Sequence, residues 1–176
     1  MDSSIHIPIV DLNDHIIGYE EKLDVHVKGL LHRAFSIVVF NKHQQILIHQ
    51  RALHKYHSGG LWTNTCCGHP IEAESMESAV HRRLKEEMGF DCDLTYSFKF
   101  QYEVVFKNGL TENEIDHVYE GQFDGEFKVN PEEVANFRWV DMDELETGIK
   151  TNPALYTVWF KEIMKYMRNF EYNKKP

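Results

Sequence analysis

The densest group of reactive side chains lies in a loop and in the helix predicted to follow it. Cys67 and His69 are in the loop, while Arg83 and Glu87 are four residues apart and would share one face of the helix. Glu86 precedes Glu87, so both acids fall in the last turn, where the helix C-terminus carries partial negative charge. Two acids there indicate a nearby cation, such as a metal ion, although the helix alone fits a solvated charged face better.

The helix itself is specified by its ends and by one apolar face. Ser75 is suited to cap the N-terminus, and Gly89 follows the last periodic residue. Apolar side chains recur every four residues between them, at Met76, Val80, Leu84 and Met88. We therefore predict an amphipathic helix of about four turns that packs this stripe on a core.

Five residues spread along the chain combine the ligand types of a divalent metal site. They are His26, His32, His69, Glu112 and Glu114. Alternate strand residues such as Glu112 and Glu114 project from the same face of a sheet. Mixed nitrogen and oxygen ligands suit zinc, manganese or magnesium, and histidine suits zinc best. From spacing alone, however, a solvated strand face is the simpler interpretation of the acids, Asp116 included.

Cys67 is open to three interpretations: an inert buried thiol, a ligand beside His69, or an acid–base group. A buried thiol is the commonest fate of a cysteine, and one Cys-x-His without a second cysteine motif is a weak zinc signature. The three cysteines, at positions 66, 67 and 92, show no paired spacing. A disulfide framework is therefore not expected, and a reducing compartment fits.

Composition restricts the classes of partner. The 176 residues suit one domain with a full core, and the net charge of −9 offers no basic surface for nucleic acid. No apolar run is long enough for a membrane span, and the first residues lack the features of a signal peptide. We expect one domain over residues 1–176, located in the cytoplasm, with no nucleic acid or membrane as partner.

Short β-like runs separated by turns surround the reactive segment. Strands are predicted at 5–12, 15–19, 33–41, 45–51, 98–106, 112–123 and 137–141. Two further helices are predicted at 143–150 and 153–170, and residues 20–31 form a short helix or an irregular connection. Antiparallel hairpins dominate, the pair 33–41 and 45–51 being the best supported. The fold class expected is an α/β (α+β) sandwich, in which helices cover a mixed, largely antiparallel sheet.

The loop and helix resemble the Nudix box, in which carboxylates are presented to a metal ion bound to a diphosphate. The matching residues are Gly68, Glu74, Arg82, Leu84, Glu86, Glu87, Gly89 and Phe90. The resemblance implies the same sandwich fold. One position departs from the pattern, because Arg83 stands where Nudix hydrolases carry an acid of the metal cluster that activates water. This departure argues against ordinary diphosphate hydrolysis.

A second resemblance fits that departure. The segments WTNTCCGHP and TENEID, with His26 and His32 upstream, resemble the type I isopentenyl-diphosphate isomerases, a Nudix subfamily that moves a double bond and leaves the diphosphate intact. The resemblance covers residues 20–159. It implies that the three histidines, Glu112 and Glu114 bind one metal ion. It also implies that Cys67 on one face of the substrate, and Glu114 with Tyr102 on the other, transfer protons.

The same resemblance implies how the substrate is held. Arg51, Lys55, Arg83 and Lys22 would bind the diphosphate, and Glu87 would hold a bridging Mg²⁺. Trp159 would cover the hydrocarbon, where an aromatic face stabilises a carbocation. The plainer alternatives are a surface position for Arg51, pairing with Glu87 alone for Arg83, and core packing for Trp159.

Three functions remain as alternatives. The preferred one is an isomerase that acts on an isoprenyl diphosphate, a small-molecule partner, as a monomer. The others are a Nudix diphosphate hydrolase and a noncatalytic binding module in which the metal is structural.

Overall fold

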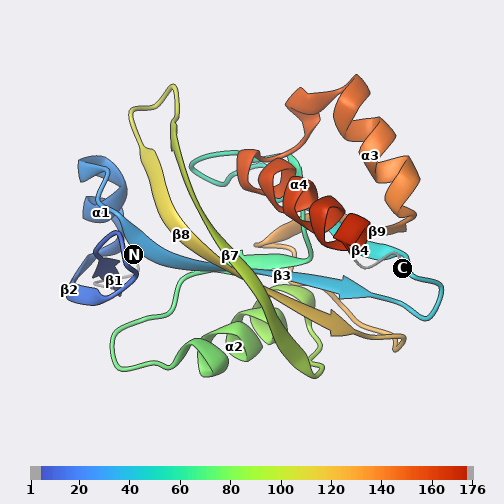
Figure 1. Cartoon of the computed structure of the whole chain (residues 1–176), viewed down its shortest axis with the longest axis horizontal. Coiled ribbons are helices and arrows are strands. Elements are labelled where there is room, and N and C mark those ends of the chain that lie inside the picture. The colour runs from blue at the N-terminus through green and yellow to red at the C-terminus, as the bar shows by residue number, and fades with distance from the viewer. Residues whose placement is uncertain (1–4, 174–176) are drawn as a thin grey trace.

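The architecture is one curled, mixed sheet with helices on both faces. It is seen in a computed structural model that describes residues 5–173 (Figure 1). The described residues form nine strands: β1 (His6–Val10), β2 (Ile16–Glu21), β3 (His32–Phe40), β4 (Ile46–Arg51), β5 (Trp62–Thr63), β6 (Cys66–Gly68), β7 (Leu94–Val105), β8 (Thr111–Gln122) and β9 (Val134–Val140). The α-helices are α1 (Lys22–Lys28), α2 (Met76–Met88), α3 (Met142–Thr151) and α4 (Val158–Asn173). The predicted fold class is confirmed.

Strand β3 is the centre of the sheet. It runs parallel to β8 along its whole length and antiparallel to β6, and it meets β1 at one edge. Strands β7 and β8 form a long hairpin, as predicted, while β9 and β5 extend the sheet beyond β4. His32, Cys67 and Glu114 are brought together in this way, because β6 and β8 both pair with β3.

The hairpin predicted over 33–41 and 45–51 is only partly correct. Both strands exist, but β3 and β4 pair only between Phe40 and Ile46. Beyond that position each strand takes partners that are distant in sequence. Both strands are almost entirely buried, so neither needs to stay beside its local neighbour to protect an apolar face.

The predicted capping residues lie at the two ends of α2. The Ser75 hydroxyl accepts a hydrogen bond from the Ser78 amide at 3.1 Å, and Gly89 has the left-handed conformation, with φ 75°. The predicted helix 153–170 is interrupted, because a 3-10 turn (Pro153–Leu155) comes first and α4 begins only at Val158. In the interruption, the amide of Thr157 donates to the carbonyl of Trp62, which ties the start of α4 to β5.

Two apolar cores lie on the two faces of the sheet (Figure 1). One contains Leu84 and Met88 of α2, so the predicted stripe packs as expected, although Met76 is only partly buried. The other core includes Trp159, Phe160 and residues of the β7–β8 hairpin. Helices α2 and α4 therefore pack on opposite faces of the sheet.

The β1–β2 hairpin is fastened to the sheet by one buried carboxylate. Asp14 lies in the turn and contacts Arg33 on β3, Lys99 on β7 and His117 on β8, each at 2.8 Å. This group of four residues is called the Asp14 cluster below. Because α1 follows β2 directly, the cluster also sets where α1 lies against the sheet.

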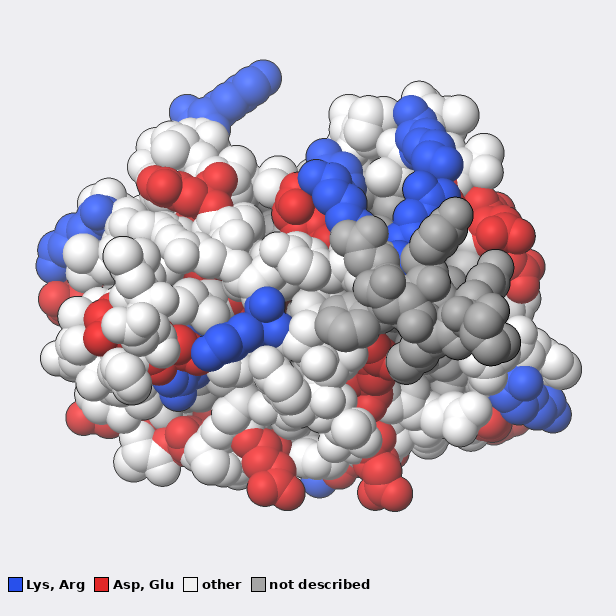
Figure 2. All heavy atoms as spheres, in the orientation of Figure 1, with Lys and Arg blue, Asp and Glu red and all other residues white. Residues whose placement is uncertain are grey.

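The surface carries charges of both signs. Figure 2 shows lysines and arginines interspersed with acids on one face, without a continuous basic area there. Among the described residues, no helix is long and apolar enough to cross a membrane.

Candidate active site

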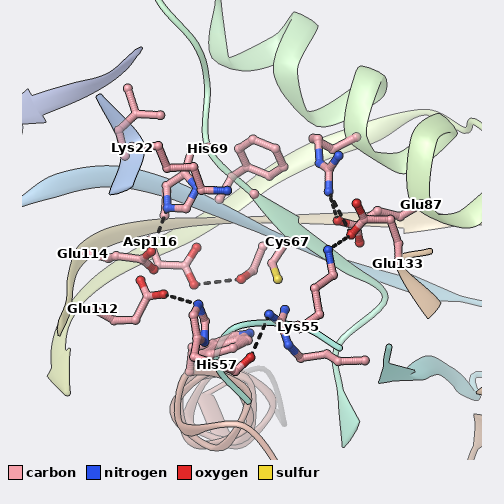
Figure 3. A pocket seen from close by; sticks show the side chains of 18 of the residues that line it. Lys22, Lys55, His57, Cys67, His69, Glu87, Glu112, Glu114, Asp116 and Glu133 are labelled. Carbon is pink, nitrogen blue, oxygen red and sulfur yellow. Dashed lines mark hydrogen bonds and ion pairs between the residues drawn. The ribbon is translucent and has the colours of Figure 1, made fainter. Parts of the chain in front are cut away.

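A pocket of about 320 Å³ opens between the two helical layers, a volume at the lower end of those that hold small ligands. Its walls come from α1, β3, β6, α2, β8, α4 and the loop after β4. Figure 3 shows Cys67 between two groups of charged side chains, with the acids of β8 on one side and Glu87 and Glu133 on the other. The pocket therefore has two chemically different ends with a thiol between them.

The first end lies beside the five residues predicted as metal ligands, of which His69, Glu112 and Glu114 line the pocket. His26, His32, His69, Glu112 and Glu114 offer ligand atoms that all lie within 4.8 Å of one another. This set is called the His/Glu cluster below. All five side chains are buried or nearly so, hence the solvated-face interpretation of Glu112, Glu114 and Asp116 is wrong.

Backbone contacts aim two of the histidines into the cluster. Nδ1 of His26 lies 2.6 Å from the carbonyl oxygen of Lys22, and Nδ1 of His32 lies 2.8 Å from that of Leu30. A proton on each Nδ1 would donate to the carbonyl and leave Nε2 as a free acceptor facing the cluster. Histidines that bind metal ions are commonly oriented in this way.

The cluster contains more acceptors than donors. His69 Nε2 and His32 Nε2 lie 2.9 and 3.2 Å from the same oxygen of Glu114. By contrast, His26 Nε2 and Glu112 Oε2 are buried without a hydrogen-bond partner among the described residues. Buried polar atoms are rarely left unpaired, so these orphaned atoms fit coordination of a cation.

Electrostatics lead to the same conclusion. Burial and the neighbouring Glu114 raise the pKa of Glu112 to about 8, and burial lowers the pKa of His69 to about 3. A neutral His69 cannot offset the charge of the adjacent Glu114, whose pKa is lowered by the hydrogen bonds that its carboxylate accepts. A divalent ion would supply the missing positive charge, and the donor set fits such an ion.

The predicted proton-transfer groups line the same pocket. The Tyr102 hydroxyl donates to Glu114 Oε2 at 2.6 Å, and Cys67 lies nearer the middle of the pocket (Figure 3). Burial, with a contribution from Glu87, raises the pKa of Cys67 to about 12. The thiol is therefore protonated at neutral pH.

The residues before Cys67 explain why this loop is well defined. Asn64 is fully buried, and its side-chain amide donates to the carbonyls of Ile37 and Cys66 at 3.1 and 2.7 Å. Thr63 and Thr157 hydroxyls lie 2.9 Å apart, which links the loop to the residue before α4. The TNTC segment thus orients the cysteine loop through buried hydrogen bonds.

The predicted diphosphate ligands also line the pocket: Arg51, Lys55, Arg83 and Lys22. Lys55 points toward Glu133 at the second end, while Lys22 lies on the side of His69 (Figure 3). Arg83 forms an ion pair with Glu87, and both Arg83 and Lys55 pair with Glu133. Burial and the nearby Arg83 lower the pKa of Lys22, which marks a crowded positive region. The cation expected near Glu86 is supplied by Arg82 and Arg83, because this exposed acid pairs with both.

Trp159 is buried against the pocket, and the guanidinium of Arg51 lies 5.3 Å from its ring centre. Trp62, by contrast, does not line the pocket and packs under Arg138. The cation–π contact places Arg51 where a positive charge and an aromatic face meet.

Three pocket residues were missed by reasoning from sequence. His57 contacts Glu112, Asp116 accepts a hydrogen bond from Ser36 at 2.8 Å, and Glu133 pairs with Lys55. His57 and Glu133 lie in segments without periodicity, so only tertiary contact reveals them. The alternation of Asp116 with Glu112 and Glu114 did place it on their face, and its burial was the missing information.

Comparisons with known proteins identify the family and the relatives of this chain. The NUDIX domain family matches residues 30–160. The chain is 51% identical to Isopentenyl-diphosphate Delta-isomerase 2 of Photorhabdus laumondii, with 89% of this chain and 88% of that protein covered. It is 48% identical to Isopentenyl-diphosphate Delta-isomerase of Serratia proteamaculans, with coverage of 89% and 88%.

Solved structures share the fold at low identity. A protein of Deinococcus radiodurans superposes with a TM-score of 0.74 and 18% identity, covering 93% of this chain and 98% of that one. A MutT NUDIX hydrolase of Burkholderia pseudomallei gives a TM-score of 0.62 and 21% identity, with coverage of 77% and 96%. These likenesses establish the sandwich architecture alone.

Proposed function

Because this chain belongs to the Nudix family and, within it, to the isopentenyl-diphosphate Delta-isomerases, we propose that it interconverts isopentenyl and dimethylallyl diphosphate. The observation that carries the proposal is that Cys67 and the Tyr102–Glu114 pair line one pocket. Unpaired metal-ligand atoms lie beside the same pocket, and lysine and arginine side chains also line it. The reaction supplies precursors for isoprenoid biosynthesis.

The chemistry requires one proton to be added to the terminal alkene carbon and another to be removed from the carbon on the far side of the cation. Protonation gives a tertiary carbocation, and loss of the second proton gives the isomeric alkene. We assign these transfers to Cys67 on one side of the hydrocarbon and to Glu114, assisted by Tyr102, on the other. The Tyr102 hydrogen bond would keep the Glu114 carboxyl in a fixed orientation during transfer.

The carbocation must be stabilised and kept from water. Trp159 is 4% exposed and would present its ring to the hydrocarbon, where a cation is attracted to the aromatic face. Burial of the surrounding side chains limits the water that could capture the cation.

The diphosphate would bind to Arg51, Lys55, Arg83 and Lys22, which all line the pocket. Arginine offers two parallel donors to phosphate oxygens, whereas lysine contributes a point charge. On binding, the diphosphate would compete with Glu133 for Lys55 and Arg83.

Two metal sites complete the proposal. His26, His32, His69, Glu112 and Glu114 would hold one ion, either zinc, manganese or magnesium, and Glu87 would hold Mg²⁺ against the diphosphate. When bound, these ions would neutralise the buried acids and the phosphate oxygens. Arg83 stands at the position at which a Nudix hydrolase carries another acid, and it pairs with Glu87, which speaks against hydrolysis.

We further propose that residues 1–176 act as one catalytic domain and as a monomer. The three cysteines are free, which supports a reducing compartment such as the cytoplasm.

Proton NMR of isopentenyl diphosphate in D₂O, with purified protein and Mg²⁺, tests the function directly. We expect deuterated dimethylallyl diphosphate to appear without free phosphate. Release of phosphate would indicate hydrolysis, and an unchanged substrate would favour a binding module.

A further inference from the structure

We propose that His57 is a positioning residue of the metal site and fixes the orientation of Glu112 by a hydrogen bond. The proposal rests on the proposed function, since it takes the His/Glu cluster to be the metal site. His57 is not a member of that cluster. It lies on the loop after β4, between Lys55 and the cysteine segment.

The contact with Glu112 is close and buried. His57 Nε2 lies 2.9 Å from Glu112 Oε1, a contact seen in Figure 3. His26 Nε2 lies 3.5 Å from the same oxygen. The second oxygen, Oε2, is buried without a hydrogen-bond partner among the described residues and is 4.0 Å from His32 Nε2. A hydrogen bond from His57 Nε2 to Oε1 would therefore leave Oε2 available to the metal ion.

Aromatic packing holds the His57 ring in place. The ring stacks on Phe106 with centroids 4.8 Å apart and an interplanar angle of 14°. Tyr56 and Trp159 approach it edge-on at 4.7 and 6.0 Å. With neighbours on several sides, the ring has little freedom to rotate, and Nε2 stays within hydrogen-bonding distance of Glu112.

The arrangement repeats a device seen elsewhere in the pocket. Glu114 receives the Tyr102 hydroxyl, while His26 and His32 are oriented by backbone carbonyls. Among the described residues, His57 provides the corresponding outer contact for Glu112. Partners of this kind orient a ligand and raise its affinity for metal, and their loss typically costs about 10- to 100-fold in affinity.

Two substitutions separate hydrogen bonding from packing. His57→Phe keeps an aromatic ring against Phe106 but removes the donor. His57→Gln loses the ring, yet its amide nitrogen can reach the position of Nε2. A positioning bond predicts that Gln is tolerated and Phe is not, whereas a packing role predicts the reverse order.

The probe is Co²⁺, whose visible absorption reports on the ligands around it. Metal-free protein would be titrated with Co²⁺, and affinity would be measured by competition with a chelator. We expect His57→Phe to bind Co²⁺ about 10- to 100-fold more weakly than the wild type, with an altered spectrum, and His57→Gln to bind close to the wild type. Equal affinity of His57→Phe and wild type, or weaker binding by Gln than by Phe, would overturn the proposal.

Controls keep this result separate from the proposed function. His54 lies on the same loop, is 62% exposed and pairs with the exposed Glu132 at 3.8 Å, outside the His/Glu cluster, so His54→Phe should leave Co²⁺ binding unchanged. His26→Ala should abolish the Co²⁺ spectrum if the ion occupies the His/Glu cluster. A spectrum that survives His26→Ala would refute the metal assignment itself, and the His57 proposal with it. If His26→Ala abolished the Co²⁺ spectrum but His57→Phe bound Co²⁺ like the wild type, the His57 proposal alone would be refuted.

Discussion

Two buried groups of acids in this protein are compensated in opposite ways. In the Asp14 cluster, one carboxylate with 6% exposure is surrounded by Arg33, Lys99 and His117. In the His/Glu cluster, Glu112 and Glu114 lie side by side among imidazoles, and two ligand atoms have no partner in the described part of the chain. The first group holds its own counter-charges, while the second lacks them.

The pKa values follow this difference. Burial would raise the pKa of Asp14, but hydrogen bonds from Lys99 and Arg33 outweigh it, and the pKa is lowered. Burial and Glu114 raise the pKa of Glu112 to about 8, because no fixed cation opposes them sufficiently. A buried acid that is paired with cations of the protein stabilises the fold. A buried acid without such a cation is suited to bind a positively charged ligand.

The largest effect, a loss of turnover, is expected from substituting Cys67 in the pocket. Cys67→Ala removes one proton-transfer group, and we expect kcat to fall by about 10²- to 10⁴-fold, the usual contribution of a positioned acid or base. Because Cys67 is a free cysteine outside the His/Glu cluster, thermal stability and Co²⁺ binding should stay close to those of the wild type. NMR turnover, thermal denaturation and Co²⁺ titration of one preparation check this, and full activity of the variant would refute the role of the thiol.

The Asp14 cluster should show the reverse pattern. Asp14 has φ 66°, which asparagine also tolerates, so Asp14→Asn removes the charge without straining the turn. We expect a loss of about 1.5–3 kcal/mol in the free energy of unfolding, the range for hydrogen bonds to charged groups. Urea denaturation measures this loss.

The pH dependence of that loss is a further check. A lowered pKa in the folded state contributes stability that is present above the unfolded pKa and lost as pH falls through the folded value. The difference between wild type and Asp14→Asn should therefore shrink below about pH 4. A difference independent of pH would show that the charge is not responsible.

The sequence predicted features whose causes are local. Ser75 and Gly89 specified the ends of α2, and alternation placed Glu112, Glu114 and Asp116 on one face of a strand. The resemblance added the five ligands, which the fold brings together.

What the sequence could not reveal depends on contacts between distant segments. The turn position of Asp14 gave no sign that Arg33, Lys99 and His117 would surround it, since these residues lie on three different strands. Nor could the apolar runs of β3 and β4 show that they separate after one pair. In each case the decisive term is burial, which only the assembled sheet determines.

The His/Glu cluster should respond to charge removal with the opposite sign to Asp14. Between about pH 4.3, where an unfolded glutamate ionises, and pH 8, the folded metal-free protein holds a proton on Glu112 that the unfolded chain releases. Stability therefore falls as pH rises through this window. We expect Glu112→Gln, with metal chelated, to lose less stability between pH 5 and pH 8 than wild type, as urea titrations at several pH values would measure. Parallel pH profiles would contradict the raised pKa.

The smallest effect is expected from the exposed member of an adjacent pair of acids on α2. Glu86 has a side-chain exposure of 44% and pairs with Arg82 and Arg83, whereas Glu87 is buried in the pocket wall. Solvent screens the pairs of Glu86, so Glu86→Gln should cost less than about 1 kcal/mol in unfolding free energy and leave the Mg²⁺ dependence of turnover unchanged. Glu87→Gln should raise the Mg²⁺ concentration needed for half-maximal rate, because it removes the carboxylate assigned to that ion. If both variants shifted the Mg²⁺ requirement equally, local negative charge rather than a specific ligand would govern the ion, and burial would not separate the two acids.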